Sequence, residues 1–124
     1  MITGIGIDVV QVKRMEHWLG NAGILERYFH PAELEYVSSR GDGAALSLAA
    51  RFAAKEAFGK ALGIGFTNIT LKDIMVSNNQ IGRPEIKLFF SAQEALKRSG
   101  ADTVHVSLTH EKDNAIAMVV LERV

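Results

Sequence analysis

The stretch AALSLAARFAAKEAFGKAL, residues 44–62, decides how the rest of this 124-residue chain folds. Most of its residues have high helix propensities, so a long helix is predicted that ends at Gly63. Leu48, Phe52 and several alanines give this helix an apolar face. Because alanine side chains are small, a neighbouring element can approach closely, and we expect that neighbour to be a sheet.

Strands are predicted on either side of this central helix. Residues 2–10, ITGIGIDVV, alternate apolar residues with small or polar ones, the period of a strand that packs one face on a core. Four further apolar runs with strand-like composition follow the helix and are separated by turn residues. These runs cover residues 68–76, 84–90, 103–109 and 114–122. In sequence order they predict two hairpins.

Shorter helices complete the predicted fold. Residues 11–20 have an apolar face that includes Trp18, with Arg14 on the other face. A second helix is predicted over residues 31–38. A third is predicted over residues 91–99, because the chain there begins with the Ser-x-x-Glu pattern of a capping box. The order of elements predicts an α+β fold, with helices packed on a mostly antiparallel sheet.

Length and composition are those of one globular domain over residues 1–124. The 14 Lys+Arg residues balance the 14 Asp+Glu residues, so no global basic field is available for nucleic acid. The absence of cysteine excludes disulfide scaffolds, thiolate zinc sites and cysteine nucleophiles, and a reducing cytosol is the simplest compartment for such a chain. No run of about 18 apolar residues predicts a membrane span, and the N-terminus does not have the pattern of a signal peptide.

Asp8 is the first candidate for chemistry, because it is an acid in an otherwise apolar strand and aspartate is disfavoured in strands. Two interpretations are open. The strand ends at Ile7 and Asp8 begins a turn, or Asp8 is a carboxylate that a rigid strand holds for a metal ion or a proton.

The central helix carries a second set of candidates, the charged residues Arg51, Lys55, Glu56 and Lys60. Their spacing of four residues is typical of a solvated helix face with an intrahelical Glu56–Lys60 ion pair. However, Glu56 also lies on the stripe that carries the apolar side chains, where a carboxylate needs a partner. A cation shared with Asp8 would satisfy both acids, and carboxylate oxygens suit Mg²⁺.

Glycines and strand-end polar residues form the remaining candidates. Gly63 and Gly65 follow Lys60 closely, so their free N–H groups could bind a phosphate, although a glycine after a helix is commonly only a cap. Ser107 and His110 lie at the end of a predicted strand, where a histidine is commonly a surface residue. From the residues alone we infer only two acids that could share Mg²⁺, with basic groups available for phosphates.

With these residues in view, the sequence resembles the bacterial holo-[acyl-carrier-protein] synthases, the small phosphopantetheinyl transferases. The resemblance covers essentially the whole chain in order and spacing. The matching segments are GIGID at 4–8, RFAAKEA at 51–57, KALG at 60–63, GRP at 82–84 and VSLTH at 106–110. It implies a phosphopantetheinyl transferase fold, and transfer of the 4′-phosphopantetheine arm of coenzyme A to a serine of apo acyl carrier protein, releasing adenosine 3′,5′-bisphosphate.

The resemblance also implies roles for individual residues. Asp8 and Glu56 would be the Mg²⁺ ligands, and Lys60 would neutralise the transferring phosphate. Residues that would bind coenzyme A are Arg51, Lys60, Arg83, Pro84, Ser107 and His110 through side chains, and Gly63 and Gly65 through the backbone. Arg14 and Arg27 would face the acidic carrier protein. The family is a homotrimer with coenzyme A in a cleft between adjacent subunits.

Two other interpretations are compatible with the residues. The chain could be a non-catalytic oligomeric module that binds a nucleotide or coenzyme A through its glycines and basic groups. It could also be an α+β assembly domain whose polar residues are only surface. Retention of both candidate metal acids favours the transferase over these two.

Overall fold

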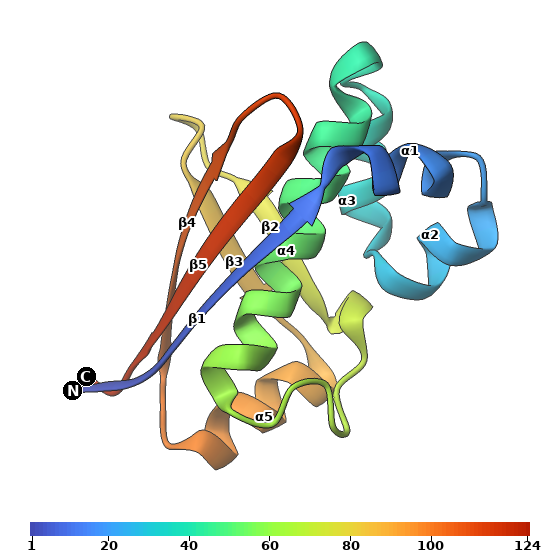
Figure 1. Ribbon diagram of the computed structural model, residues 1–124. Helices are drawn as coiled ribbons and strands as arrows, with labels where there is room; N and C mark the ends of the chain where they lie inside the picture. The colour runs from blue at the N-terminus through green and yellow to red at the C-terminus, as the bar shows by residue number, and fades with distance from the viewer.

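The computed structural model describes residues 1–124 and has the predicted α+β architecture. Helix α4 (Ala44–Leu62) crosses the centre of the molecule, with a sheet on one side and shorter helices on the other (Figure 1). Gly63 ends this helix in the left-handed conformation at φ 79°, as the sequence predicts. None of the helices is long and apolar enough to cross a membrane.

The strands form two antiparallel sheets. The larger sheet has the order β1–β5–β4, so the first and last strands of the chain lie side by side. The smaller sheet pairs β2 with β3. Their bounds are β1 (Ile2–Gln11), β2 (Ile74–Asn78), β3 (Pro84–Leu88), β4 (Thr103–His110) and β5 (Asn114–Glu122). Every predicted strand is therefore present, and the prediction of antiparallel hairpins is confirmed.

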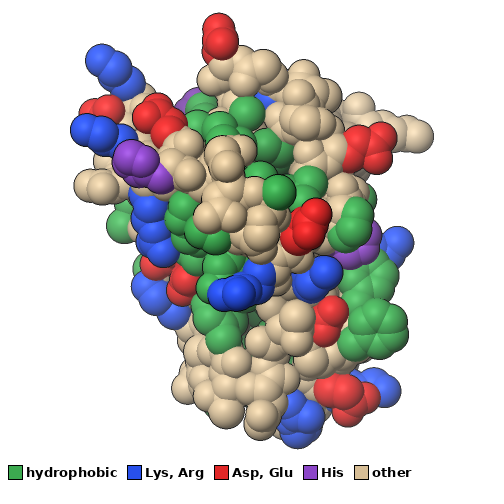
Figure 2. All heavy atoms as spheres, turned by 90° about the vertical axis from the view of Figure 1, so that its right-hand side faces the viewer, with side chains coloured by type: hydrophobic (Ala, Val, Ile, Leu, Met, Phe, Trp, Pro, Cys, Tyr) green, Lys and Arg blue, Asp and Glu red, His purple; other side chains and the backbone are tan.

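The helices cover the side of α4 that the larger sheet leaves free (Figure 1). Their bounds are α1 (Val12–Leu19), α2 (Ala22–Tyr28), α3 (Pro31–Ser38) and α5 (Phe90–Ser99). Short 3₁₀ turns, η1 (Gly41–Gly43) and η2 (Leu71–Asp73), connect them to their neighbours. Basic and acidic side chains are mixed over this helical face, as the neutral net charge predicts (Figure 2).

Helix α2 is absent from the sequence prediction, which has no helix between residues 20 and 31. In the structure the Asn21 side chain accepts a hydrogen bond from the backbone N–H of Ile24 and so begins a new helix. Asparagine is common both at the end of one helix and as the N-cap of the next. The residue type alone therefore does not show whether a new helix begins there.

Two predicted boundaries are wrong at η2 and α5. The predicted strand over 68–76 begins only at Ile74, because residues 71–73 form a 3₁₀ turn. Helix α5 begins one residue before Ser91, whose hydroxyl contacts Asp73 instead of capping the helix. The capping box lies at α3, where His30 Nδ1 accepts from Ala32 N–H and Glu33 accepts from the backbone N–H of His30.

The larger sheet packs unusually close to α4, and two glycines of β1 make this possible. A Cβ atom on Gly6 would lie 2.0 Å from the carbonyl oxygen of Ala57, and one on Gly4 would lie 2.0 Å from that of Ala61. The alanines of α4 therefore meet strand backbone directly. This confirms the prediction that the alanine-rich helix face packs against a sheet.

Replacement of Gly6 by alanine is expected to destabilise the fold by about 3 kcal/mol, because the new methyl group must push β1 away from the backbone of α4. Thermal unfolding measures the loss. Gly20→Ala is the matched control, since nothing lies within 4 Å of a Cβ at Gly20. An equal melting temperature for the two variants would contradict the close β1–α4 approach.

Candidate active site

Asp8 lies inside β1, which continues to Gln11, so the interpretation of Asp8 as a turn residue is wrong. Its position in the strand puts it on the same side as Gly4 and Gly6, facing α4. There Asp8 Oδ1 accepts a hydrogen bond from Lys60 Nζ at 2.9 Å, and the same ammonium donates to the carbonyl oxygen of Ile7 at 3.1 Å. One predicted acid and one predicted cation are thus brought together.

Glu56 lies on α4 one turn before Lys60 and is half-buried. Burial raises the pKa of its carboxyl, and the negative charge of Asp8 raises it further, whereas Arg14 and Lys60 act in the opposite direction. Lys60 pairs with Asp8 across the two elements rather than with Glu56 along the helix. The interpretation of Glu56 and Lys60 as an intrahelical ion pair is therefore wrong, and no ion pair of the structure involves Glu56.

A divalent cation would suit this pair of acids. Asp8 and Glu56 are close enough for each other's charge to be felt, and both supply hard oxygen ligands. The chain has no group of three or more acidic, histidine or cysteine side chains that could hold a metal ion by themselves. Two carboxylates with the remaining positions left to water and substrate phosphate is the arrangement that Mg²⁺ commonly takes.

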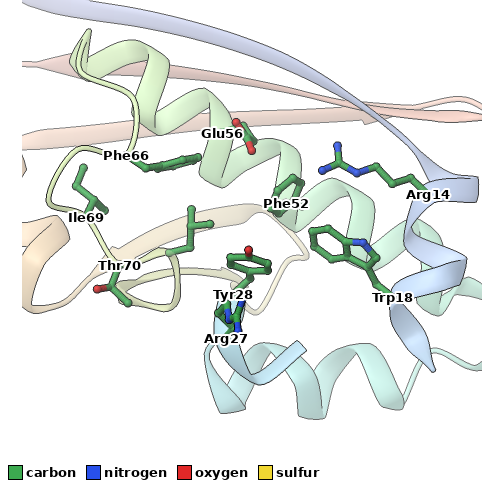
Figure 3. A pocket seen from close by; sticks show the side chains of 10 residues that line it. Arg14, Trp18, Arg27, Tyr28, Phe52, Glu56, Phe66, Ile69 and Thr70 are labelled. Atoms are coloured by element: carbon green, nitrogen blue, oxygen red, sulfur yellow. The ribbon is translucent and has the colours of Figure 1, made fainter. Parts of the chain in front are cut away.

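A cavity of about 530 Å³ opens beside Glu56. Helices α1, α2 and α4 and the segment before β2 supply its walls (Figure 3). Much of the lining is aromatic, from Trp18, Tyr28, Phe52 and Phe66, while Arg14 and Arg27 add positive charge. The cavity is therefore lined by apolar rings and basic groups, and it lies beside the pair of acids.

A second cluster surrounds Arg51, nearer the start of α4. Its guanidinium donates to Ser47 Oγ at 2.8 Å and to Asn78 Oδ1 at 3.0 Å, and lies 4.3 Å from the ring centroid of Tyr36. Burial lowers the pKa of Arg51, although the charge of Glu33 opposes this. Arg51 Nε has no hydrogen-bond partner. The prediction of Arg51 on a solvated helix face is therefore wrong.

The Arg51 cluster borders a cavity of about 250 Å³ that Arg40, Thr109 and His110 also line. Several donors and two cationic groups around one hollow suit an anion such as a phosphate. Arg51 and His110 are predicted from the sequence, whereas Tyr36, Arg40 and Asn78 are not. These come from α3, the following loop and β2, and no motif marks them.

The remaining predicted residues do not join these two clusters. Ser107 alternates with His110 along β4, so its side chain faces the other side of the sheet, opposite Met118 of β5. Arg83 and Pro84 line a separate polar cavity of about 350 Å³ between β3 and β4.

The two predicted phosphate-binding glycines lie just after α4, beside Lys60. Gly63 and Gly65 are exposed and both have positive φ, 79° and 61°. Side chains at these two positions would be strained, so the backbone conformation itself favours glycine there. The predicted site therefore divides into an Asp8–Glu56–Lys60 group and an Arg51–His110 group.

The family model of the 4′-phosphopantetheinyl transferase superfamily matches residues 4–119 of this chain. The chain belongs to this superfamily. Among relatives of this phosphopantetheinyl transferase, the holo-[acyl-carrier-protein] synthase of Treponema denticola is 58% identical over 98% of this chain and 99% of its own length. That of Geobacter sp. (strain M21) is 46% identical over 99% of this chain and 100% of its own length.

Solved structures of the family have the same fold. The holo-[acyl-carrier-protein] synthase of Neisseria meningitidis superimposes with a TM-score of 0.89 at 33% identity, covering 99% of this chain and 100% of that chain. The Bacillus anthracis enzyme, in complex with coenzyme A (3′,5′-ADP), gives a TM-score of 0.83 at 34% identity and covers 100% of this chain and 99% of that chain. The predicted family and fold are confirmed.

Proposed function

We propose that this chain is a holo-[acyl-carrier-protein] synthase. It transfers the 4′-phosphopantetheine arm of coenzyme A to a serine of apo acyl carrier protein and releases adenosine 3′,5′-bisphosphate. The observation that carries this function is the meeting of Asp8, Glu56 and Lys60 across β1 and α4, within a chain that is 58% identical to a holo-[acyl-carrier-protein] synthase. Two structural relatives are in complex with coenzyme A, which supports coenzyme A as the donor of the transferred group.

The reacting phosphate belongs beside the acids. Asp8 and Glu56 would hold Mg²⁺, which supplies charge stabilisation to the diphosphate when bound. Lys60 Nζ, exposed and already turned toward Asp8, is placed to donate to a phosphate oxygen. Phosphoryl transfer needs mainly positioning and charge neutralisation, and the carrier protein brings the nucleophilic serine itself. The backbone N–H groups of Gly63 and Gly65 add donors at the end of α4.

The nucleotide end of coenzyme A belongs with the second cluster. Arg51 is held rigidly by Ser47, Asn78 and Tyr36 and borders the same cavity as His110, which suits a phosphate of the nucleotide. Arg83 and Pro84 line a separate cavity between β3 and β4 and are assigned to the nucleotide by their place in the family pattern. Ser107 is assigned to coenzyme A by its place in the family pattern, and its side chain lies on the outer sheet face.

The separation of the two clusters supports a homotrimer with shared active sites. Asp8 lies on β1 and His110 on β4, the two outer strands of the larger sheet. The outer face of that sheet also exposes apolar side chains that a partner would cover, since Ile5, Ile7 and Val9 are 57–62% exposed. A neighbouring copy on this face would bring its Arg51–His110 group to the acids of the first subunit.

Carrier protein would dock on the surface that α1 and α2 form. Arg14 and Arg27 lie on opposite walls of the cavity beside Glu56, where their positive charge would attract an acidic partner (Figure 3). The aromatic side chains between them offer apolar contact area close to the proposed point of transfer.

Mass spectrometry of the carrier protein tests the proposed activity. The purified chain is incubated with apo acyl carrier protein, coenzyme A and Mg²⁺, and the carrier should gain the mass of one phosphopantetheine group. No mass gain with folded protein would contradict the function. If coenzyme A nevertheless bound in a calorimeter independently of Mg²⁺, the non-catalytic binding module would be the better interpretation.

Mixing two inactive variants tests the shared cleft. Glu56→Gln removes one acid, and His110→Ala removes a group of the other cluster, so neither homotrimer has an intact site. Hybrid trimers formed after partial unfolding and refolding together should regain a fraction of wild-type activity. Light scattering measures the assembly. A monomer, or mixtures that stay inactive, would contradict shared sites.

A further inference from the structure

Phe90 is an aromatic residue whose side chain the fold hardly uses. At 79% exposed, it is the most exposed aromatic residue of the chain. Its ring approaches one other ring, that of Phe89, with 6.5 Å between the centroids. Its backbone has φ 39°, a value that a bulky residue adopts only at a cost in free energy, and the one other non-glycine residue with positive φ is Asn68. The ring therefore contributes little to the stability of the chain by itself.

Hydrogen bonds to Asp73 fix the place at which Phe90 projects. The backbone N–H of Phe89 donates to the carbonyl oxygen of Asp73 at 2.9 Å. The backbone N–H and the hydroxyl of Ser91 both donate to the Asp73 carboxylate. The two neighbours of Phe90 are thus bound to η2, and the ring stands at a fixed position on the first turn of α5.

The first turn of α5 adjoins the cavity beside Glu56. Ser91 Oγ accepts a hydrogen bond from the backbone N–H of Thr70 at 2.9 Å. Thr70 lines this cavity, on the side away from Arg14 (Figure 3). One hydrogen bond therefore connects the turn that carries Phe90 to the wall of the cavity at which carrier protein would arrive.

Aromatic contacts connect the same turn to α2. His30, the N-cap residue of α3, stacks on Phe89 with 5.4 Å between the ring centroids. Tyr28, the last residue of α2, lines the cavity together with Arg27. We call His30, Phe89 and Phe90 the aromatic patch. It begins two residues after the cavity wall and ends on α5, so it is continuous with the proposed carrier surface.

We propose that the aromatic patch is a further contact site for acyl carrier protein, so that the carrier is bound on both sides of the cavity. This rests on the proposed transferase function. Arg14 and Arg27 attract the acidic carrier, and Phe90 packs on an exposed apolar side chain that the carrier brings. Lys72 in η2 is also exposed, so basic groups lie on both sides of the patch. An acidic protein with an exposed apolar side chain fits this combination of charge and rings.

The proposed homotrimer leaves the aromatic patch uncovered. Its interface is the outer face of the larger sheet, whereas α5 belongs to the helices on the side of α4 that this sheet leaves free (Figure 1). A second copy of the chain in the trimer therefore does not explain why Phe90 is exposed. Carrier protein must approach the cavity beside Glu56 in every turnover, and the patch lies next to that cavity.

Binding of a carrier that cannot be modified tests the patch without turnover. Calorimetry with a carrier whose acceptor serine is replaced by alanine should show about tenfold weaker binding to Phe90→Asn, the size expected when an aromatic side chain is covered at an interface. Asparagine and glycine both tolerate positive φ, so Phe90→Asn and Phe90→Gly should fold and melt at or above the wild-type temperature. Phe90→Tyr keeps a ring and should bind within about threefold of wild type.

Steady-state kinetics separates carrier binding from the chemical step. In Phe90→Asn the carrier KM should rise about tenfold, while kcat and the KM for coenzyme A should change by less than about twofold, because the patch does not touch the reacting groups. The ratio of wild-type to variant affinity should persist at high salt, which screens the arginines but not an apolar contact. Val124→Asn is the matched control, since it removes an apolar side chain that is 89% exposed at the C-terminus, and it should bind carrier as the wild type does.

Two results would overturn the proposal and leave the transferase function intact. One is unchanged carrier affinity in folded Phe90→Asn and Phe90→Gly. The other is light scattering in which these variants lose an association between trimers while their carrier affinity stays the same, since the occupant of the patch would then be a second copy. Absence of transfer by the wild-type chain would overturn both the proposal and the function.

Discussion

Replacement of Glu56 by glutamine is expected to lower kcat/KM by about 1,000-fold or more, because it removes one of the two carboxylates that we propose hold the metal ion. Glutamine keeps the size and hydrogen-bonding oxygen of the side chain but not its charge. A factor of 1,000 corresponds to about 4 kcal/mol of lost transition-state stabilisation. The carrier mass assay measures the rate, and titration with Mg²⁺ should fail to restore it.

Although Glu56→Gln should lower the activity, it should not lower the thermal stability of the folded protein. Since burial and Asp8 raise the folded-state pKa of Glu56, the folded protein holds this proton at pH values where the unfolded chain has released it. Ionised Glu56 therefore costs stability above its unfolded pKa of about 4.3, and the cost is fully present once pH exceeds the raised folded pKa. Without metal at neutral pH, Glu56→Gln should melt at or above the wild-type temperature.

A matched control separates the charge of Glu56 from the general effect of losing an acid. Glu94 is exposed on α5, away from the candidate site, and Glu94→Gln should retain wild-type kinetics. Full activity of Glu56→Gln would contradict the metal assignment. A variant that is inactive but also unfolded would contradict the expectation that Glu56 is dispensable for the fold.

The sequence predicts most of the fold because its patterns are local. Helix α4 has uniform helix propensity and a glycine end, and β1 alternates over residues 4–9, so both are found at nearly the predicted bounds. The face of β1 that packs on the core is mispredicted, because its glycines face α4 while Ile5, Ile7 and Val9 are exposed. The start of β2 is mispredicted because tertiary contacts decide it. Lys55 Nζ donates to the carbonyl oxygens of Leu71 and Ile74, and this favours a 3₁₀ turn where the residues alone look strand-like.

The candidate site is predictable only in part for a related reason. Asp8 is conspicuous because it interrupts an apolar strand, and Glu56 because it lies on a packing face. Spacing along α4 could not show that Arg51 is buried, since the groups that bind it come from α3 and β2, far along the chain. The prediction that places Arg14 and Trp18 on different faces of their helix is wrong, since residues four apart are neighbours on a helix and the Arg14 guanidinium carbon lies 5.3 Å from the Trp18 ring centroid.

Replacement of Lys55 by methionine should destabilise the folded protein by about 3–5 kcal/mol, although the two side chains have similar shape. Lys55 and Glu33 are fully buried and form an ion pair at 2.7 Å between Nζ and Oε1. Burial lowers the pKa of Lys55, and the charge of Glu33 opposes this, so each group depends on the other. Methionine would leave the Glu33 carboxylate buried with only backbone N–H partners, from His30 and Val76.

A double-mutant cycle at fixed protein concentration distinguishes this pair from ordinary core packing. Glu33→Gln together with Lys55→Met removes both charges, while the amide oxygen can still accept a hydrogen bond from the backbone. The stability lost in the double variant should therefore be smaller than the sum of the two single losses by at least about 2 kcal/mol. Lys72→Met, at an exposed lysine of η2, should change stability by less than about 0.5 kcal/mol. Additive losses in urea unfolding would mean that the two charges do not stabilise each other. A large coupling energy would show that the Lys55–Glu33 ion pair fixes the buried side of α4, the helix that also carries Glu56. Helical periodicity alone would place the Lys55 charge in solvent.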